Sequence, residues 1–174
     1  MTNDSDHFPF HPGEYEAQVR FNSGWDEGKA RRLGRIIGCS LDDEKAMFIE
    51  LLPFFFLATA DAAGNCDCSF KGTEPETEGR SLPVVHVVDP KRLWFPDYSG
   101  NRMYNSLGNI LQNPHVGLLF IDFASQTRLR VNGRARILEQ RDGWKNHWPA
   151  AMRAAEVSVD QVYCNCSKRI PKRP

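Results

Sequence analysis

The strongest constraint on this sequence is a strict alternation of apolar and polar residues over positions 128–137. One set of alternate positions is apolar or small: Leu129, Val131, Gly133, Ala135 and Ile137. The other set is polar: Arg128, Arg130, Asn132, Arg134 and Arg136. A period of two is typical of a strand with one buried face and one solvated face. The segment therefore predicts a β-strand, and the chain must supply a core for its apolar face.

Shorter apolar runs bounded by turn residues predict further strands on both sides of this one. The first covers 54–60, and the last is a short strand at about 159–164. Gaps of hairpin length join most of them, and Gly64 supplies a turn position where positive φ costs little. About six short strands with few helices are typical of an antiparallel barrel rather than a doubly wound sheet. We therefore expect a mainly β fold with flanking helices.

Three helices are expected around these strands. The first begins at a Ser40 cap and ends before Pro53, the second spans about 101–112, and the third spans about 143–155. The second lies between two strands and is placed to plug one end of a barrel. The first 40 residues are polar and rich in turn residues, so we predict an N-terminal arm over 1–40 and a barrel domain over 41–174.

Charge and hydropathy exclude several classes of protein. The 22 Lys and Arg residues balance 22 Asp and Glu residues, so no net charge draws the chain to nucleic acid or to an anionic membrane. Hydrophobic residues make up 41%, which is ordinary for a globular domain. No apolar run approaches the roughly 18 residues of a membrane span, and the acidic start is unlike a signal peptide. We expect a cytoplasmic domain that binds neither nucleic acid nor membrane.

The five cysteines leave two interpretations open. They occur as Cys39, the pair Cys66 and Cys68, and the pair Cys164 and Cys166. An odd number argues against a disulfide scaffold. The two pairs would be needed for a zinc site, but their single-residue gap differs from structural zinc knuckles. Reduced thiols are therefore the favoured interpretation, and no metal site is predicted.

Two polar segments are candidates for phosphate binding. Ser69 and Lys71 share a strand face with Asp67, and a hydroxyl beside an ammonium can hold a phosphate oxygen. The other interpretation of this face is a solvated outer surface. Asn101, Asn105 and Asn109 are spaced by four and would share one helix face. The strand segment and the helix segment form one site only if they converge in space.

The start of the second helix adds to the phosphate hypothesis. Asparagine is a poor helix former, so a stripe of three costs stability unless it gains something. The free amides at a helix N-terminus favour an anion. An ordinary cap with a solvated polar face remains the alternative.

The arginine face over 128–136 also needs partners, because unpaired buried charges are costly. Two interpretations are open: ion pairs in a dimer interface, or contacts with an anionic ligand. A nucleic-acid surface is disfavoured by the zero net charge. The sequence contains no P-loop, nucleophile elbow or dinucleotide-binding glycine motif.

Two segments carry the most specific motifs. One runs from Gly100-Asn101 through Asn105-Ser106-Leu107 to Asn113-Pro114, and the other is Leu129-Arg130-Val131-Asn132-Gly133. Together with 54–61 and 64–72, they resemble the pyridoxamine 5'-phosphate oxidase-related flavin-nucleotide-binding proteins. The resemblance spans most of residues 8–170. It departs from the family in a longer loop over 72–83 and in Asn105-Ser106, which stand near the place of the true oxidase's Ser-Arg-Lys phosphate clamp.

The resemblance implies a split β-barrel of the six-stranded antiparallel Greek-key type that binds FMN. It also implies a homodimer with the cofactor at the subunit interface and an oxidoreductase activity on a small-molecule substrate. The cofactor-binding residues that it implies are Ser69, Phe70, Lys71, Phe95, Pro96, Asp97, Asn101, Asn105, Ser106, Asn109, Arg130 and Asn132. No catalytic acid or base is assigned. The alternative is a non-catalytic flavin- or haem-binding module for storage or sensing.

Overall fold

The structure is a computed structural model, and it describes residues 10–21, 24, 26–74, 82–165 and 168–171. The chain divides into two compact units, Met1–Gly38 and Cys39–Pro174. The first unit contains helices α1 (Pro12–Phe21) and α2 (Glu27–Gly34). Asp26 caps α2, because its carboxylate accepts a 2.7 Å hydrogen bond from the amide of Gly28.

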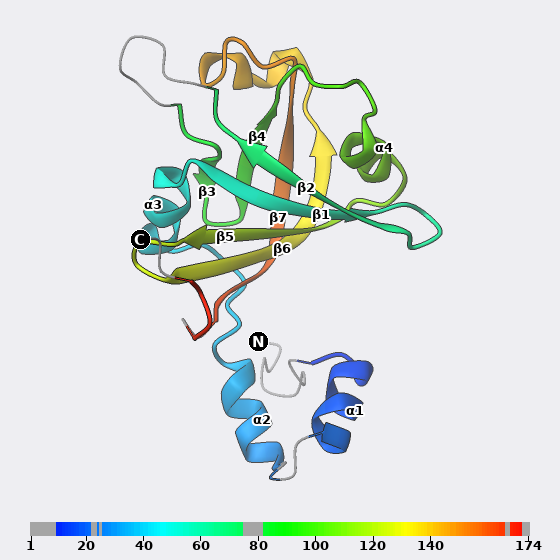
Figure 1. Cartoon of the computed structure of the whole chain (residues 1–174), viewed down its shortest axis with the longest axis vertical. Helices are drawn as coiled ribbons and strands as arrows, with labels where there is room; N and C mark the ends of the chain where they lie inside the picture. The colour runs from blue at the N-terminus through cyan, green and yellow to red at the C-terminus, as the bar shows by residue number, and fades with distance from the viewer. Residues whose placement is uncertain (1–9, 22–23, 25, 75–81, 166–167, 172–174) are drawn as a thin grey trace, which may run out of the picture. The chain divides into compact units, whose positions relative to one another are not determined.

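The second unit is built on one antiparallel sheet of seven strands (Figure 1). The strands are β1 (Phe54–Ala60), β2 (Cys66–Gly72), β3 (His86–Asp89), β4 (Arg92–Asp97), β5 (His115–Asp122), β6 (Thr127–Ile137) and β7 (Arg153–Cys164). Their order across the sheet is β2-β1-β5-β6-β7-β4-β3. The mainly β prediction is confirmed, with seven strands in place of the expected six. Of the expected long loop over 72–83, residues 75–81 lie outside the described residues.

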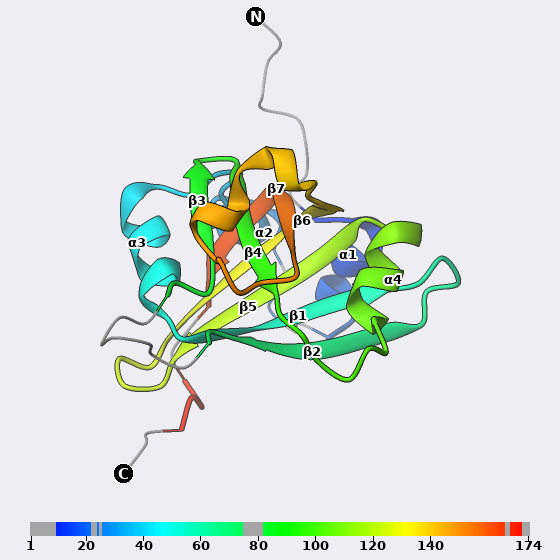
Figure 2. The same ribbon diagram turned by 90° about the horizontal axis from the view of Figure 1, so that it is seen from above.

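Helices α3 (Asp43–Leu51) and α4 (Asn105–Gln112) lie at opposite sides of the sheet (Figure 2). The cap of α3 is Asp42 rather than Ser40, since the Asp42 carboxylate accepts a hydrogen bond from the Lys45 amide at 2.9 Å. Among the described residues, no helix combines the length and apolar character that crossing a membrane requires.

The main core lies on the inner side of the sheet. The alternation over 128–137 is confirmed, since Leu129, Val131 and Ala135 are buried there. Phe55 stacks on Phe120 with ring centroids 5.2 Å apart. At Gly133 a side chain is excluded: a Cβ would lie 2.1 Å from the carbonyl oxygen of Ser158 on β7. The strand pattern in the sequence thus corresponds to a packed face.

The predicted helix over 143–155 is wrong. Within this segment the structure has one 3-10 turn, Trp144–Asn146, which follows another at Gln140–Asp142, and β7 begins at Arg153. Gly143 between the two turns has φ of 84°, which a continuous helix does not allow. The buried Trp144 and Trp148 side chains form a second, smaller core, so tertiary packing decides this segment.

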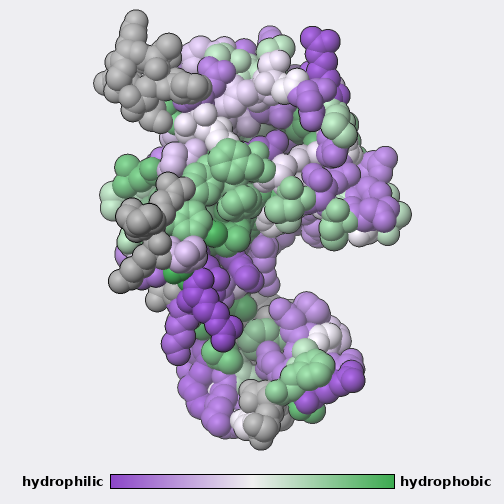
Figure 3. Space-filling view, in the orientation of Figure 1, coloured by the Kyte–Doolittle hydropathy of each residue, from purple (hydrophilic) through white to green (hydrophobic). Residues whose placement is uncertain are grey.

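The outer face of β1 and β2 carries a cluster of aromatic side chains. Phe54 stacks on Phe70 at 5.2 Å and on Phe123 at 6.3 Å, and Phe56 packs edge-on against Phe70 at 6.0 Å. The Phe70 side chain is 62% exposed. Figure 3 shows apolar side chains gathered over this part of the surface. Apolar patches of this kind are typical of interaction surfaces.

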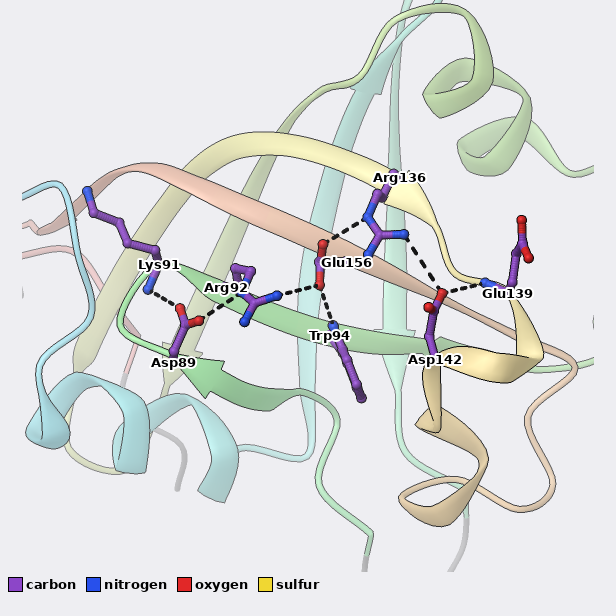
Figure 4. Close-up of polar contacts among 8 residues, drawn as sticks. All are labelled: Asp89, Lys91, Arg92, Trp94, Arg136, Glu139, Asp142 and Glu156. Atoms are coloured by element: carbon purple, nitrogen blue, oxygen red, sulfur yellow. Dashed lines mark hydrogen bonds and ion pairs between the residues drawn. The ribbon is translucent and has the colours of Figure 1, made fainter.

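The arginine face of β6 finds its partners within the chain, on β7. Arg134 lies 3.2 Å from Asp160, and Arg136 lies 2.9 Å from the buried Glu156 (Figure 4). Glu156 also accepts a hydrogen bond from the Trp94 indole at 2.9 Å. A third arginine, Arg130, contacts the hydroxyl and the ring of Tyr163. Arg134 and Arg136 therefore need neither a dimer interface nor a ligand as partner, because acidic residues of β7 form ion pairs with them.

Candidate functional site

A cavity of about 400 Å³ lies between β2, the end of β4, the 98–104 loop and the start of α4. Seven of the predicted cofactor residues line it: Ser69, Phe70, Lys71, Asp97, Asn101, Asn105 and Ser106. Ser69 and Lys71 on the strand thus line the same cavity as the start of the helix at Asn105, which is the convergence that the sequence prediction required.

The place of β2 at the edge of the sheet leaves room for this cavity. Ser69 pairs with Leu57 and Lys71 pairs with Phe55 across the β1–β2 ladder, so both point to the inner side of the sheet. The paired Leu57 and Phe55 are fully buried. Because β2 has a neighbouring strand on only one side, its inner face is closed by α4 instead. The hydroxyls of Ser69 and Ser106 lie 2.9 Å apart and join the two elements.

The helix start is built to present free amides. Tyr104 precedes α4 with a left-handed backbone, and no side chain caps the helix. The amides of the first turn, at Asn105, Ser106 and Leu107, therefore lack a side-chain acceptor from the cap. The helix dipole adds partial positive charge at this end. An anion is the natural partner of such a terminus.

The predicted helix over 101–112 begins four residues later than expected, at Asn105. Arg102 and Tyr104 adopt φ of 64° and 56°, and a left-handed residue of this kind interrupts a helix. Each costs about 1–3 kcal/mol, and such strain is found where a surrounding site holds it in place. Asn101 therefore lies in the loop, where its side chain accepts a hydrogen bond from the Met103 amide, and shares no helix face with Asn105.

Side-chain charges in the cavity are balanced. Two cationic side chains, Lys71 and Arg102, and two anionic ones, Asp67 and Asp97, line it. The Lys71 ammonium lies 3.7 Å from the Asp97 carboxylate, and both side chains are less than one fifth exposed. The side-chain charges offset one another. The remaining positive potential comes from the amides at the start of α4, so the cavity favours an anion.

Tyr98 forms part of the same wall. Burial raises the pKa of its hydroxyl, and the nearby Glu74 carboxylate raises the pKa further. The hydroxyl therefore stays protonated at neutral pH. The Glu74 backbone has the smallest effect on this pKa and lowers it.

Comparison with known proteins identifies the family. A family model described as pyridoxamine 5'-phosphate oxidase matches residues 41–169. The chain belongs to this family. Comparison with curated proteins found no match.

Solved structures with a TM-score above 0.5 share the fold of this chain. HupZ of Group A Streptococcus matches with a TM-score of 0.52 at 15% identity, over 71% of this chain and 93% of HupZ. A Lactobacillus delbrueckii protein provisionally assigned as a pyridoxamine 5'-phosphate oxidase matches with a TM-score of 0.52 at 22% identity, over 72% and 95% of the two chains. HutZ, described as the heme storage protein of Vibrio cholerae, has a TM-score of 0.45 at 15% identity. The predicted fold class, a split β-barrel of this family, is confirmed.

Five predicted cofactor residues of this oxidase-family chain do not line the cavity. Phe95 and Pro96 are buried in β4, where the Phe95 ring packs edge-on against Phe55 at 5.6 Å. Asn109 donates a 3.0 Å hydrogen bond to the Thr59 hydroxyl and so fastens α4 to β1.

The other two of the five lie across the sheet. Asn132 pairs with Gly117, and Arg130 pairs with Leu119, on the face opposite Ser69 and Lys71. Asn132 donates a 3.1 Å hydrogen bond to Gln161.

The sequence prediction missed Arg102, Met103 and Tyr104, which line the cavity from the loop. The prediction of a helix from residue 101 selected the residues spaced by four, Asn101, Asn105 and Asn109, and passed over the three between the first two. The Ser99-Gly100-Asn101 turn was the available signal that the chain is not helical there.

The cysteines add no site among the described residues. Cys39, Cys66, Cys68 and Cys164 are exposed free thiols. Cys166, which the zinc interpretation would need, lies outside the described residues. Within the described ranges, no group of three or more His, Cys, Asp or Glu side chains is arranged to hold a metal ion.

Proposed function

We propose that this protein binds FMN in the cavity between β2 and α4 and uses it for hydride or electron transfer with a small-molecule substrate. The observation that carries the proposal is the meeting of Ser69 and Lys71 with the uncapped N-terminus of α4. Membership of the pyridoxamine 5'-phosphate oxidase family supports it.

The residues present fit the phosphate end of FMN. The first-turn amides of α4 would hold phosphate oxygens, as helix N-termini do. The hydroxyls of Ser69 and Ser106 and the Lys71 ammonium line the same cavity and add charge-assisted hydrogen bonds. The Asn105 side-chain amide lies at the same helix end.

The remaining walls fit a flat ring system. Phe70 is 62% exposed and Met103 is 67% exposed, so apolar surface is available beside the polar groups. A volume of about 400 Å³ lies within the range of about 300–1,000 Å³ that ligand sites occupy. When bound, the flavin supplies reversible electron and hydride transfer, while the protein orients it and tunes its electronics. No residue is assigned as an acid or base.

A homodimer with the cavity at the subunit interface is part of the proposal. Phe70 belongs both to the exposed aromatic cluster and to the cavity wall. A second copy packed on the aromatic face would therefore border the cavity. Arg130 and Asn132 lie on this outer face. In such a dimer, these two residues of one copy would lie near the flavin bound by the other copy. The exposed thiols fit a cytoplasmic, reducing location.

The absorption spectrum of the purified protein tests the proposal. A flavin spectrum is expected, with FMN as the released chromophore, followed by bleaching on anaerobic addition of NADH or NADPH. Full flavin occupancy without reduction by either donor would support a binding module in place of an enzyme. Colourless protein that fails to take up added FMN, or a haem Soret band without flavin, would contradict the proposal.

A further inference from the structure

A second, smaller hollow lies beside the proposed cofactor cavity. Its volume is about 250 Å³, and it shares Tyr98, Gly100, Arg102 and Tyr104 with the larger cavity. The 98–104 loop thus borders both spaces. This volume is just below the range of about 300–1,000 Å³ that ligand sites occupy, so the hollow suits a small molecule.

The hollow has the charge of an anion site. Arg102 and Arg153 line it, and none of its lining residues is acidic. The Arg153 guanidinium lies 5.1 Å from the centre of the Tyr104 ring, and this stacking holds the planar group in place. A guanidinium can bind a carboxylate or a phosphate through two parallel hydrogen bonds. Met152, which is 55% exposed, adds apolar surface for the rest of a ligand.

We propose that this hollow is the subsite for the second reactant of the flavin, a small molecule whose carboxylate or phosphate group binds Arg102 and Arg153. Its role as a reactant site rests on the proposed function, whereas anion binding there does not. The small volume and the shared loop place such a ligand next to the cofactor cavity.

Asp97 links the two spaces. One of its carboxylate oxygens lies 3.7 Å from the Lys71 ammonium, and the other lies 3.6 Å from the Arg153 guanidinium. The Arg153 side chain is 40% exposed, so its pair with Asp97 is weak and a ligand anion can replace it. Asp97 therefore competes with anions in both spaces. Removing its charge is expected to tighten anion binding in the hollow.

Titration calorimetry of the FMN-loaded protein tests this subsite. The probes are benzoate, inorganic phosphate and the neutral control benzamide. Benzoate or phosphate is expected to bind saturably, and benzamide is not. Arg153→Gln is expected to weaken anion binding about tenfold, the loss of one charged hydrogen bond, while leaving FMN affinity unchanged. Asp97→Asn is expected to tighten anion binding.

Arg134→Gln is the matched control, because Arg134 is also a partly exposed arginine paired with an aspartate but lines neither space. Anion binding that is lost in Arg153→Gln and kept in Arg134→Gln supports the subsite. FMN binding without anion binding, or with equal anion affinity in both variants, overturns the subsite and leaves the proposed function standing. Arg153-dependent anion binding in a protein that does not bind FMN would keep the anion site and overturn its role as a reactant site.

Discussion

Two strand faces in this protein carry charged side chains, and of these two faces only that of β2 lines the cavity between β2 and α4. On β2, Ser69 and Lys71 face an opening that α4 closes. On β6, Arg134 and Arg136 face acidic residues of β7 and are satisfied there. The difference lies in sheet position: β2 is an edge strand, whereas β6 is flanked by β5 and β7. On β6 the adjacent strand thus supplies the counter-charges, whereas on β2 the Lys71 ammonium has Asp97 at 3.7 Å and still lines an open cavity.

The largest expected effect comes from the open face. Lys71→Ala should weaken FMN binding by about 100-fold, because a charge-assisted hydrogen bond to phosphate contributes about 1.5–3 kcal/mol. Flavin fluorescence quenching measures the affinity. Lys45→Ala is the control, since Lys45 pairs with Asp42 at the start of α3, away from the cavity. Equal affinities in the two variants would contradict the contrast between β2 and β6.

The helix start should give the next effect. Asn105→Asp places a negative charge at the uncapped N-terminus of α4, where it repels a phosphate while remaining compatible with the helix dipole. FMN affinity should fall by about tenfold, the equivalent of about 1.4 kcal/mol. Asn146→Asp, at an exposed position in the second 3-10 turn, should leave the affinity unchanged. If both variants bind FMN like the unaltered protein, the phosphate site is misplaced.

On the paired face, an effect on stability is expected instead of one on binding. Glu156 is 5% exposed and accepts hydrogen bonds from Arg136 and Trp94. Glu156→Gln should lower the free energy of unfolding by about 1–3 kcal/mol, with FMN affinity unchanged. Urea unfolding and flavin titration measure the two quantities. Loss of FMN affinity at full stability would show that the β6–β7 face also serves the ligand.

The smallest effect is expected from a histidine near the same face. The His147 ring stacks on His86 at 3.9 Å and packs against Trp94. Burial, with His86 adding to it, lowers the pKa of His147 below its usual 6.5, against a smaller opposing effect of Glu50. The unfolded chain therefore takes up a proton first as the pH falls through 6.5. The contribution of neutral His147 to the free energy of unfolding is complete above pH 6.5 and is lost as the pH falls below it.

Urea unfolding at pH 7.5 and 5.5 measures this effect. His147→Gln should reduce the loss of stability on acidification, whereas His115→Gln, at an exposed position at the start of β5, should not. An unchanged loss in the His147 variant would mean that other groups cause the acid sensitivity.

The parts of the fold that were predictable from sequence are those with a strong local pattern. The alternation of β6 identified its buried face, and the spacing of Ser69 and Lys71 placed them on one face of β2. The start of β7 was mistaken for helix because alanines at 150–155 suit a helix, and only the packing of Trp144 and Trp148 decides against it.

The candidate site was predictable in part for the same reason. Residues on regular elements, such as Ser69 and Ser106, follow from spacing. Arg102 and Tyr104 do not, because their left-handed backbone is imposed by the surrounding structure. The partners of Arg134 and Arg136 lie more than 15 residues away on β7, beyond the reach of any local pattern.

The most direct test of the central claim compares the dissociation constants of FMN and riboflavin, which differ only in the phosphate. If the phosphate binds at Lys71 and the start of α4, FMN should bind about 100-fold more tightly, and Lys71→Ala should remove most of that difference. Equal affinities for the two flavins, or a difference that Lys71→Ala leaves unchanged, would contradict the claim.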